Sequence, residues 1–182
     1  PMGLSRMLYN PLNEFDKLQI APTENDTIFR NQLVHGYVHD PAAAMMGGVE
    51  GHAGLFSNAM DLAAIMQMLL NKGIYGNQQY LQYSTIKEFT KQQFPLNKNR
   101  RGLGFDKPQP NTDNDWPVCS LASDMSFGHS GFTGTYAWVD PNNGLLYVFL
   151  SNRVYPNASN TLLMDMDIRT DIHQLFYESL KK

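Results

Sequence analysis

The clearest periodic pattern of apolar residues lies between residues 58 and 73. Apolar side chains recur there at the three- and four-residue spacing of one helix face: Leu62, Ile65, Met66, Leu69 and Leu70. Asn58 suits the N-cap, where its side chain can accept from a free amide, and Gly73 suits the C-terminal stop. The pattern predicts a helix that buries one stripe.

A second pattern predicts a β-hairpin. Residues 127–140 and 145–152 are rich in aromatic and β-branched side chains, and they flank the turn residues Asn142-Asn143-Gly144. Asn and Gly tolerate the positive φ that such turns require. Glycines just before the turn, within residues 128–134, mark positions where a ligand or another backbone comes close.

The rest of the chain has weaker patterns. Residues 1–57 are rich in turn-forming residues and predict an ordered covering layer, with one alternating strand over residues 32–40. Ser84 is predicted to be the N-cap of a helix that ends at about residue 92. Residues 102–105 are predicted to form a short strand. A last helix is predicted over residues 163–180, with its buried stripe formed by Ile168, Ile172, Leu175 and Phe176. Helices combined with antiparallel strands predict an α+β fold.

Composition narrows the class of protein. A chain of 182 residues fits one domain, and a net charge of −3 gives no basic face for nucleic acid. The densest basic run, at residues 98–101, is interpreted as a solvated loop. Cys119 is the only cysteine, so no intrachain disulfide forms, and no apolar run approaches the ~20 residues that span a bilayer. The chain begins Pro1-Met2, which predicts processing or a piece of a longer protein.

Two Ser-x-x-Lys sequences invite a nucleophile hypothesis, because one helical turn brings an amine beside the hydroxyl. Ser84 already has a role as N-cap, and Lys87 lies on a polar turn without the apolar wall that lowers a lysine pKa. The second match, at residues 179–182, lies at the end of the last helix. Tyr75-Gly76-Asn77 matches a tyrosine motif but falls in a connector. None of these is predicted to be catalytic.

Five histidines raise the question of a metal site. His35 and His39 share one face of the predicted strand, but four strand residues span ~13 Å, too far for direct chelation. Zinc needs three or four converging ligands. The sequence therefore predicts structural histidines, with no metal and no cofactor.

The strongest candidate site is His129-Ser130-Gly131. In a strand His129 and Gly131 share one face and Ser130 lies on the other. An imidazole with an ordinary pKa of ~6.5 can carry a proton, and a glycine lets a substrate approach the backbone. The alternative is that the glycine is needed only for packing, and the residues alone leave both interpretations open.

Several segments resemble the serine β-lactamase-related hydrolases, which include class C β-lactamases, penicillin-binding proteins and esterases. Residues 51–63 are similar to the family's Gly-x-Ala-Gly-Leu-x-Ser-Thr segment, and residues 127–134 to its strand with Lys/His-Thr/Ser-Gly. Residues 20–24 and 38–42 resemble the version appended to glycoside hydrolases of the β-N-acetylhexosaminidase type. The resemblance implies a β-lactamase-like antiparallel sheet and makes residues 1–182 the C-terminal part of one such domain.

The resemblance also implies roles for particular residues. His129, Ser130 and Gly131 would be catalytic, and the backbone N–H of Phe132 would form half of an oxyanion hole. Asn152 and Arg153 would bind an anionic group of the substrate. The family usually has lysine at position 129, so histidine leaves lactamase, peptidase and esterase activities open.

The family's Ser-x-x-Lys and tyrosine motifs are not matched in their usual places. The expected function is therefore part of a serine hydrolase that cleaves amide or ester bonds, or cell-wall peptides, through an acyl-enzyme, and is inactive alone. The alternative is a non-catalytic binding module that retains the cleft. The resemblance implies a periplasmic or cell-surface location, and an exposed apolar edge at residues 145–152 predicts self-association.

Overall fold

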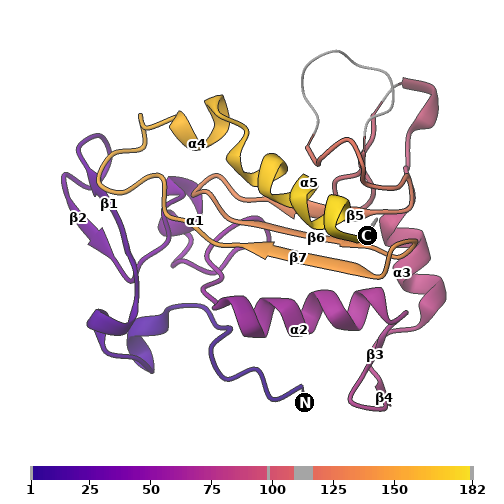
Figure 1. Cartoon of the computed structure of the whole chain (residues 1–182). Coiled ribbons are helices and arrows are strands. Elements are labelled where there is room, and N and C mark those ends of the chain that lie inside the picture. The colour runs from indigo at the N-terminus through magenta and orange to yellow at the C-terminus, as the bar shows by residue number, and fades with distance from the viewer. Residues whose placement is uncertain (1, 98, 109–116, 181–182) are drawn as a thin grey trace.

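A three-stranded antiparallel sheet forms the centre of the protein (Figure 1). The computed structural model describes residues 2–97, 99–108 and 117–180. The sheet has the order β5-β6-β7, formed by Phe127–Ser130, Tyr136–Asp140 and Leu145–Phe149. Helix α2 (Ala59–Leu70) covers one face of the sheet and α5 (Ile168–Leu180) covers the other. The predicted α+β fold is confirmed.

The remaining elements are short. Two small antiparallel pairs join β1 (Pro22–Asp26) to β2 (Gln32–His35), and β3 (Ile74–Tyr75) to β4 (Gln78–Gln79). The other helices are α1 (Pro41–Met45), α3 (Tyr83–Thr90) and α4 (Leu162–Asp165), with 3-10 turns at Pro11–Asn13, Lys17–Gln19 and Pro95–Asn97. Among the described residues, no helix is both long and apolar enough to cross a membrane.

The predicted hairpin is confirmed as β6 and β7, but the single run predicted over residues 127–140 is divided into β5 and β6 by a turn at residues 131–135. The register of β6 and β7 runs from Tyr136 opposite Phe149 to Asp140 opposite Leu145, and Gly144 takes the predicted positive φ of 62°. The buried Asp140 carboxylate accepts from the backbone N–H of Asn142 at 2.9 Å, so it holds the turn from inside. Burial alone would raise the pKa of Asp140, but hydrogen bonds from Ser123, Asn143 and Tyr177 lower it below its ordinary value.

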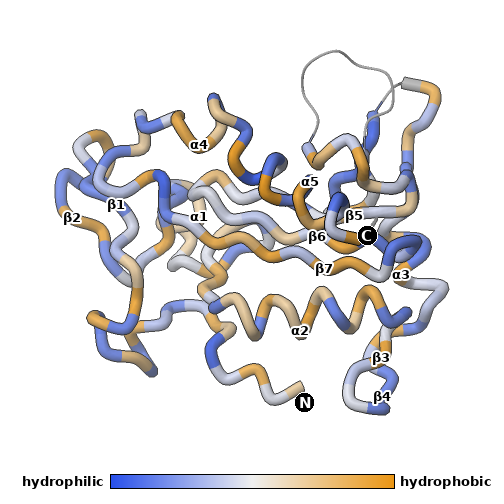
Figure 2. The backbone as a smooth tube through the Cα atoms, viewed as in Figure 1, coloured by the Kyte–Doolittle hydropathy of each residue, from blue (hydrophilic) through white to orange (hydrophobic). Residues whose placement is uncertain are grey.

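The alternation of the strands divides the core in two. Tyr136, Trp138 and Tyr147 point toward α5 and pack with Tyr177. On the opposite face Phe127 and Val139 pack against Met66 of α2, with Leu62, Leu69 and Leu70 partly buried around them. Figure 2 shows this as hydrophobic segments concentrated in the central strands and along α2.

The prediction for α2 is largely confirmed. The Asn58 side chain accepts from the N–H of Asp61 at 2.8 Å, as an N-cap does. The buried residues of this helix are Ala64, Met66 and Met68, so a second row of side chains beside the predicted stripe is also buried.

The prediction of one long final helix is wrong. The chain breaks between α4 and α5, where Asp167 takes a positive φ of 51°. The predicted stripe is correct only in part, because Ile172 packs against the core whereas Leu175 and Phe176 are 63% and 46% exposed. His173 and Tyr177 are buried instead, because the His173 ring stacks on Tyr147 at 4.6 Å. Packing of aromatic rings against the sheet has set the rotation of this helix.

Three smaller predictions are also corrected. The N-cap of α3 is Gln82, so Ser84 lies inside the helix. Residues 102–105 form a turn closed by the Gly102 N–H and the Phe105 carbonyl, rather than a strand. The strand predicted over residues 32–40 ends at His35, because Gly36 takes a φ of 80° that leaves the strand conformation.

Candidate active site

The candidate site lies at the end of edge strand β5. Phe127 packs toward α2 and Ser130 lines a cavity on the side of α5, so His129 lies on the α2 side of the strand. The neighbouring chain is a turn in which the Gly131 N–H donates to the Thr135 carbonyl at 2.8 Å. The strand and the turn therefore place His129, Ser130 and Phe132 at one edge of the sheet.

His129 is exposed and both of its ring nitrogens have partners. Nδ1 lies 2.7 Å from the carbonyl oxygen of Ser130, and Nε2 lies 2.9 Å from Nη1 of Arg101. A carbonyl only accepts and a guanidinium only donates. The imidazole that satisfies both partners is neutral, with its proton on Nδ1.

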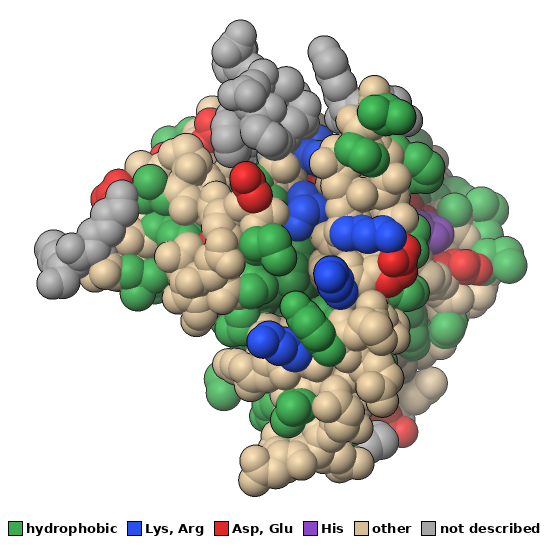
Figure 3. All heavy atoms as spheres, turned by 90° about the vertical axis from the view of Figure 1, so that its right-hand side faces the viewer, with side chains coloured by type: hydrophobic (Ala, Val, Ile, Leu, Met, Phe, Trp, Pro, Cys, Tyr) green, Lys and Arg blue, Asp and Glu red, His purple; other side chains and the backbone are tan. Residues whose placement is uncertain are grey.

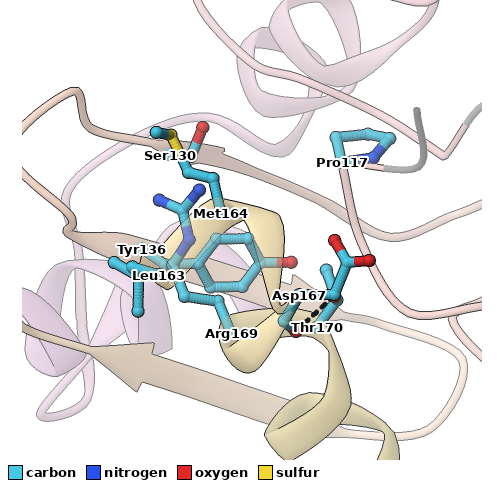
Figure 4. A pocket seen from close by; sticks show the side chains of 8 residues that line it. All are labelled: Pro117, Ser130, Tyr136, Leu163, Met164, Asp167, Arg169 and Thr170. Atoms are coloured by element: carbon cyan, nitrogen blue, oxygen red, sulfur yellow. Dashed lines mark hydrogen bonds between the residues drawn. The ribbon is translucent and has the colours of Figure 1, made fainter. Parts of the chain in front are cut away.

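Ser130 opens onto a cavity of about 180 Å³ between β5, β6 and the α4–α5 region (Figure 4). Among the described residues, no partner lies within hydrogen-bond distance of the Ser130 hydroxyl. The Arg169 guanidinium shares this cavity and donates to the Thr135 carbonyl at 3.2 Å. Burial lowers the pKa of Arg169 from its ordinary value. The other lining residues are Pro117, Tyr136, Leu163, Met164, Asp167 and Thr170.

The glycines near the site are explained by close approach of the chain to itself. A Cβ at Gly128 would lie 2.5 Å from the Trp138 ring, and a Cβ at Gly131 would lie 2.1 Å from the Thr135 hydroxyl. The packing interpretation therefore accounts for both positions. The exposed residue at this edge is Phe132, which follows Gly131 in the sequence.

The backbone of Phe132 is held on its carbonyl side. Its carbonyl accepts from Nε of Arg153 at 2.8 Å, whereas no described residue accepts from its N–H. The Phe132 ring is 63% exposed and lies between the Arg153 guanidinium, at 4.4 Å, and the His39 ring, at 5.1 Å. The peptide group that carries the Phe132 N–H is fixed separately, because the Gly131 carbonyl accepts from the Gly134 N–H at 3.0 Å. An N–H on a fixed peptide group is what an oxyanion hole requires.

The two predicted substrate-binding side chains contact the chain itself. Arg153 is 7% exposed, and its Nη1 donates to the carbonyls of Ala158 and Asn160 at 3.0 and 2.8 Å. The Asn152 side chain donates to the carbonyl of Pro22 in β1. Arg153 therefore positions Phe132, and Asn152 ties the end of β7 to the N-terminal hairpin.

The other histidines have structural contacts. His35 Nε2 lies 2.6 Å from the Ile20 carbonyl, His52 lies 3.2 Å from Asp40, and His39 lies 3.1 Å from Glu24. In the part of the chain that the structure describes, no group of three or more His, Cys, Asp or Glu side chains is arranged to hold a metal ion.

The Ser-x-x-Lys match on α3 is not assembled as a nucleophile pair. Ser84 and Lys87 are both exposed, and no hydrogen bond joins them among the described contacts. Tyr75 lies in the two-residue strand β3. The residue that sequence reasoning missed is Arg101, because no spacing rule connects a basic run to a histidine 28 positions later.

Comparison with known proteins places the chain among serine hydrolase-type proteins. It belongs to the β-lactamase family, which it matches over residues 8–165.

The chain has related sequences in enteric bacteria. It is 39% identical over 165 residues to a protein of Escherichia coli K12 named "Putative D-alanyl-D-alanine carboxypeptidase", covering 84% of this chain and 37% of that protein. A protein of the same name in Salmonella typhi is 38% identical over 172 residues, covering 88% and 39%. The chain thus spans well under half the length of these relatives.

A solved structure also resembles it. A β-lactamase from Mycobacterium bovis is 25% identical, covering 62% of this chain and 46% of that one, with a TM-score of 0.45. The family match shows that the α+β fold is β-lactamase-like.

Proposed function

We propose that residues 1–182 form the C-terminal part of the active domain of a serine hydrolase that acts through an acyl-enzyme. In this proposal Ser130 and Gly131 shape the end of β5, and His129 belongs to the polar network of the site. The nucleophile and its base come from a Ser-x-x-Lys motif that this chain does not match in the family position, so the chain alone is inactive. In this proposal residues 1–182 form a single, partial domain.

The observation that carries the proposal is the backbone N–H of Phe132, for which the described residues supply no acceptor. The peptide group that carries this N–H is held through its carbonyl, because the Gly131 oxygen accepts from the Gly134 N–H at 3.0 Å. A preorganised donor of this kind stabilises the oxyanion of acyl transfer, and its loss typically costs ~10²–10³ in kcat.

The names of the relatives support a proposal for the substrate class. Proteins named as D-alanyl-D-alanine carboxypeptidases support a peptide that ends in D-alanine as the substrate, and therefore an exported parent that works on cell-wall material. The association with glycoside hydrolases suggested by residues 20–24 and 38–42 stays a prediction.

The test joins the upstream part of the Escherichia coli relative to this chain and assays the chimera beside the intact relative. The substrates are a peptide ending in D-Ala-D-Ala and a p-nitrophenyl ester. We expect the chimera to hydrolyse at least one of them, and the isolated chain to hydrolyse neither, with Ser84→Ala changing nothing.

Two variants of the chimera make the test specific. Phe132→Pro removes the N–H and should lower kcat by ~10²–10³ with a smaller change in KM. Phe132→Ala keeps the N–H and is the matched control. Equal activity of these two variants would refute an oxyanion role for this peptide group.

The alternative is a non-catalytic binding module that has kept the cleft. It is favoured if the intact relative turns over substrate and the chimera binds the same peptide without cleaving it.

A further inference from the structure

The turn between β6 and β7 contains the only Asn-Gly sequence in the chain, Asn143-Gly144. A glycine has no side chain to hinder attack by its own nitrogen on the side-chain carbonyl of the asparagine before it. Residues 141–144 are all exposed, and a Cβ at Gly144 would have no heavy atom within 4 Å. The turn lies at the right-hand end of the central sheet in Figure 1, on the side of the molecule that faces the viewer in Figure 3. Water therefore reaches both residues.

The two groups that would react are not shielded by hydrogen bonds. Among the described residues, no acceptor pairs with the Gly144 N–H, so this nitrogen loses no hydrogen bond when it reacts. The Asn143 amide donates through Nδ2 to Oδ2 of Asp140 at 2.8 Å. No described residue donates to the side-chain carbonyl of Asn143, so its carbon stays open to attack.

The Asn143 amide is one of several donors to a buried carboxylate. Asp140 is 1% exposed. It also accepts from the N–H and the hydroxyl of Ser123 at 2.9 and 2.6 Å, from the Asn142 N–H at 2.9 Å and from the Tyr177 hydroxyl at 2.8 Å. An ionised carboxyl group in place of the amide could not donate and would add a second negative charge beside the first. Such a change would weaken the contacts that join the turn to Ser123 and to α5.

We propose that Asn143 is a site of spontaneous deamidation in the folded protein, and that this modification weakens the contacts through which Asp140 holds the turn and α5. In the first step the Gly144 nitrogen bonds to the side-chain carbonyl carbon of Asn143. The amide nitrogen leaves as ammonia, with the proton of the Gly144 N–H, and a cyclic imide remains.

In the second step water adds to one of the two imide carbonyls. The bond from that carbon to the Gly144 nitrogen breaks, the hydroxyl stays on the carbon, and the proton returns to the nitrogen. Opening at the side-chain carbonyl gives aspartate at position 143, and opening at the backbone carbonyl gives isoaspartate. Both products carry one new carboxyl group, and neither step depends on the proposed acyl transfer.

The first experiment incubates the isolated chain at pH 7.4 and 37 °C and follows residues 142 and 143 by peptide mapping with mass spectrometry. A synthetic peptide of residues 138–148 is incubated beside it. Residue 143 of the folded chain should react at no less than a tenth of the rate in the peptide, and a slower reaction overturns the proposal. Asn142 lies in the same turn but is followed by Asn143, so it should react at least tenfold more slowly than Asn143. Equal rates at the two positions also overturn the proposal.

The second experiment compares the thermal unfolding of Asn143→Asp and Asn142→Asp, which add the same charge to the same turn. Asn142 reaches Asp140 only through its backbone N–H, whereas Asn143 donates from its side chain. Asn143→Asp should lower the unfolding midpoint by several degrees, and Asn142→Asp should leave it near that of the unsubstituted chain. Asn143→Ala removes the donor without adding charge and should lie between them. Equal midpoints for the two Asp variants overturn the proposed effect on Asp140.

Discussion

Arg153 holds Phe132 in two ways at once: its Nε donates to the Phe132 carbonyl at 2.8 Å, and its guanidinium lies 4.4 Å from the centre of the Phe132 ring. The remaining bonds of the guanidinium go to the carbonyls of residues 158 and 160. One buried cation thus joins the turn after β5 to the segment before α4. The orientation of the Phe132 carbonyl and ring depends on this link.

Arg153→Met should destabilise the chain by about 2–4 kcal/mol, because it leaves three carbonyl acceptors without their charged donor. Urea unfolding measures the change. Arg153→Lys should recover only part of it, since an ammonium group cannot reproduce the planar fork. A midpoint for Arg153→Met equal to that of the unsubstituted chain would contradict the link.

Tyr177→Phe and Tyr147→Phe should have opposite outcomes. The Tyr177 hydroxyl donates to the buried Asp140 carboxylate at 2.8 Å, so its removal should cost about 1–3 kcal/mol. The Tyr147 hydroxyl is buried and no described residue pairs with it, so its removal should be neutral or slightly stabilising. Thermal unfolding of the two variants checks this, and equal losses would show that the Asp140 contact is unimportant.

His173 should make the fold sensitive to mild acid. Burial lowers the pKa of His173 from its usual 6.5 to about 4, so the folded state keeps the neutral ring while the unfolded chain takes up a proton. The stabilisation is complete above pH ~6.5 and is lost as the pH falls toward 4, by up to about 3 kcal/mol.

Unfolding free energies of the unsubstituted chain and of His173→Phe between pH 7.5 and 4 test this. The variant should lose less stability over that range, whatever its stability at pH 7.5. Below pH 4 both proteins should weaken further, because the lowered pKa of Asp140 means that its contribution is lost only as that carboxylate protonates. Parallel curves above pH 4 would exclude His173 as the titrating group.

Strand β7 pairs only with β6 among the described strands, so the self-association predicted from residues 145–152 stays a proposal. Sedimentation at increasing protein concentration should show a mass above that of the 20.6 kDa chain. Leu150→Lys places a charge at the end of this edge, where Leu150 is 40% exposed, and should reduce the association. If both the unsubstituted chain and Leu150→Lys are monomeric at micromolar concentration, the proposed self-association is refuted.

Local patterns predicted the parts of the fold that depend on neighbours in sequence. The Asn58 cap and the Asn-Asn-Gly turn follow from backbone chemistry within a few residues, and both are present. The rotation of α5 was mispredicted because hydropathy ranks Leu175 above His173, whereas stacking on Tyr147 and the pairing of Tyr177 with Asp140 decide which face is buried.

The candidate site was likewise predicted only where its residues are close together in sequence. His129, Ser130 and Phe132 were found because they are contiguous and resemble a known motif, although their roles stay proposals. The contacts of Arg153 and Arg101 could not be predicted, because they join loops 21 and 28 positions from their partners. A side chain that binds backbone carbonyls leaves no pattern of residue types to recognise.

The attachment of the N-terminal hairpin has a consequence for biosynthesis. Asn152 donates to the carbonyl of Pro22, 130 positions earlier, and the Asn25 N–H donates to the carbonyl of Pro156 at 2.9 Å. A ribosome releases β1 and β2 long before it makes the residues that fasten them. During translation this hairpin therefore lacks its attachment to the rest of the fold until residues 152–156 emerge.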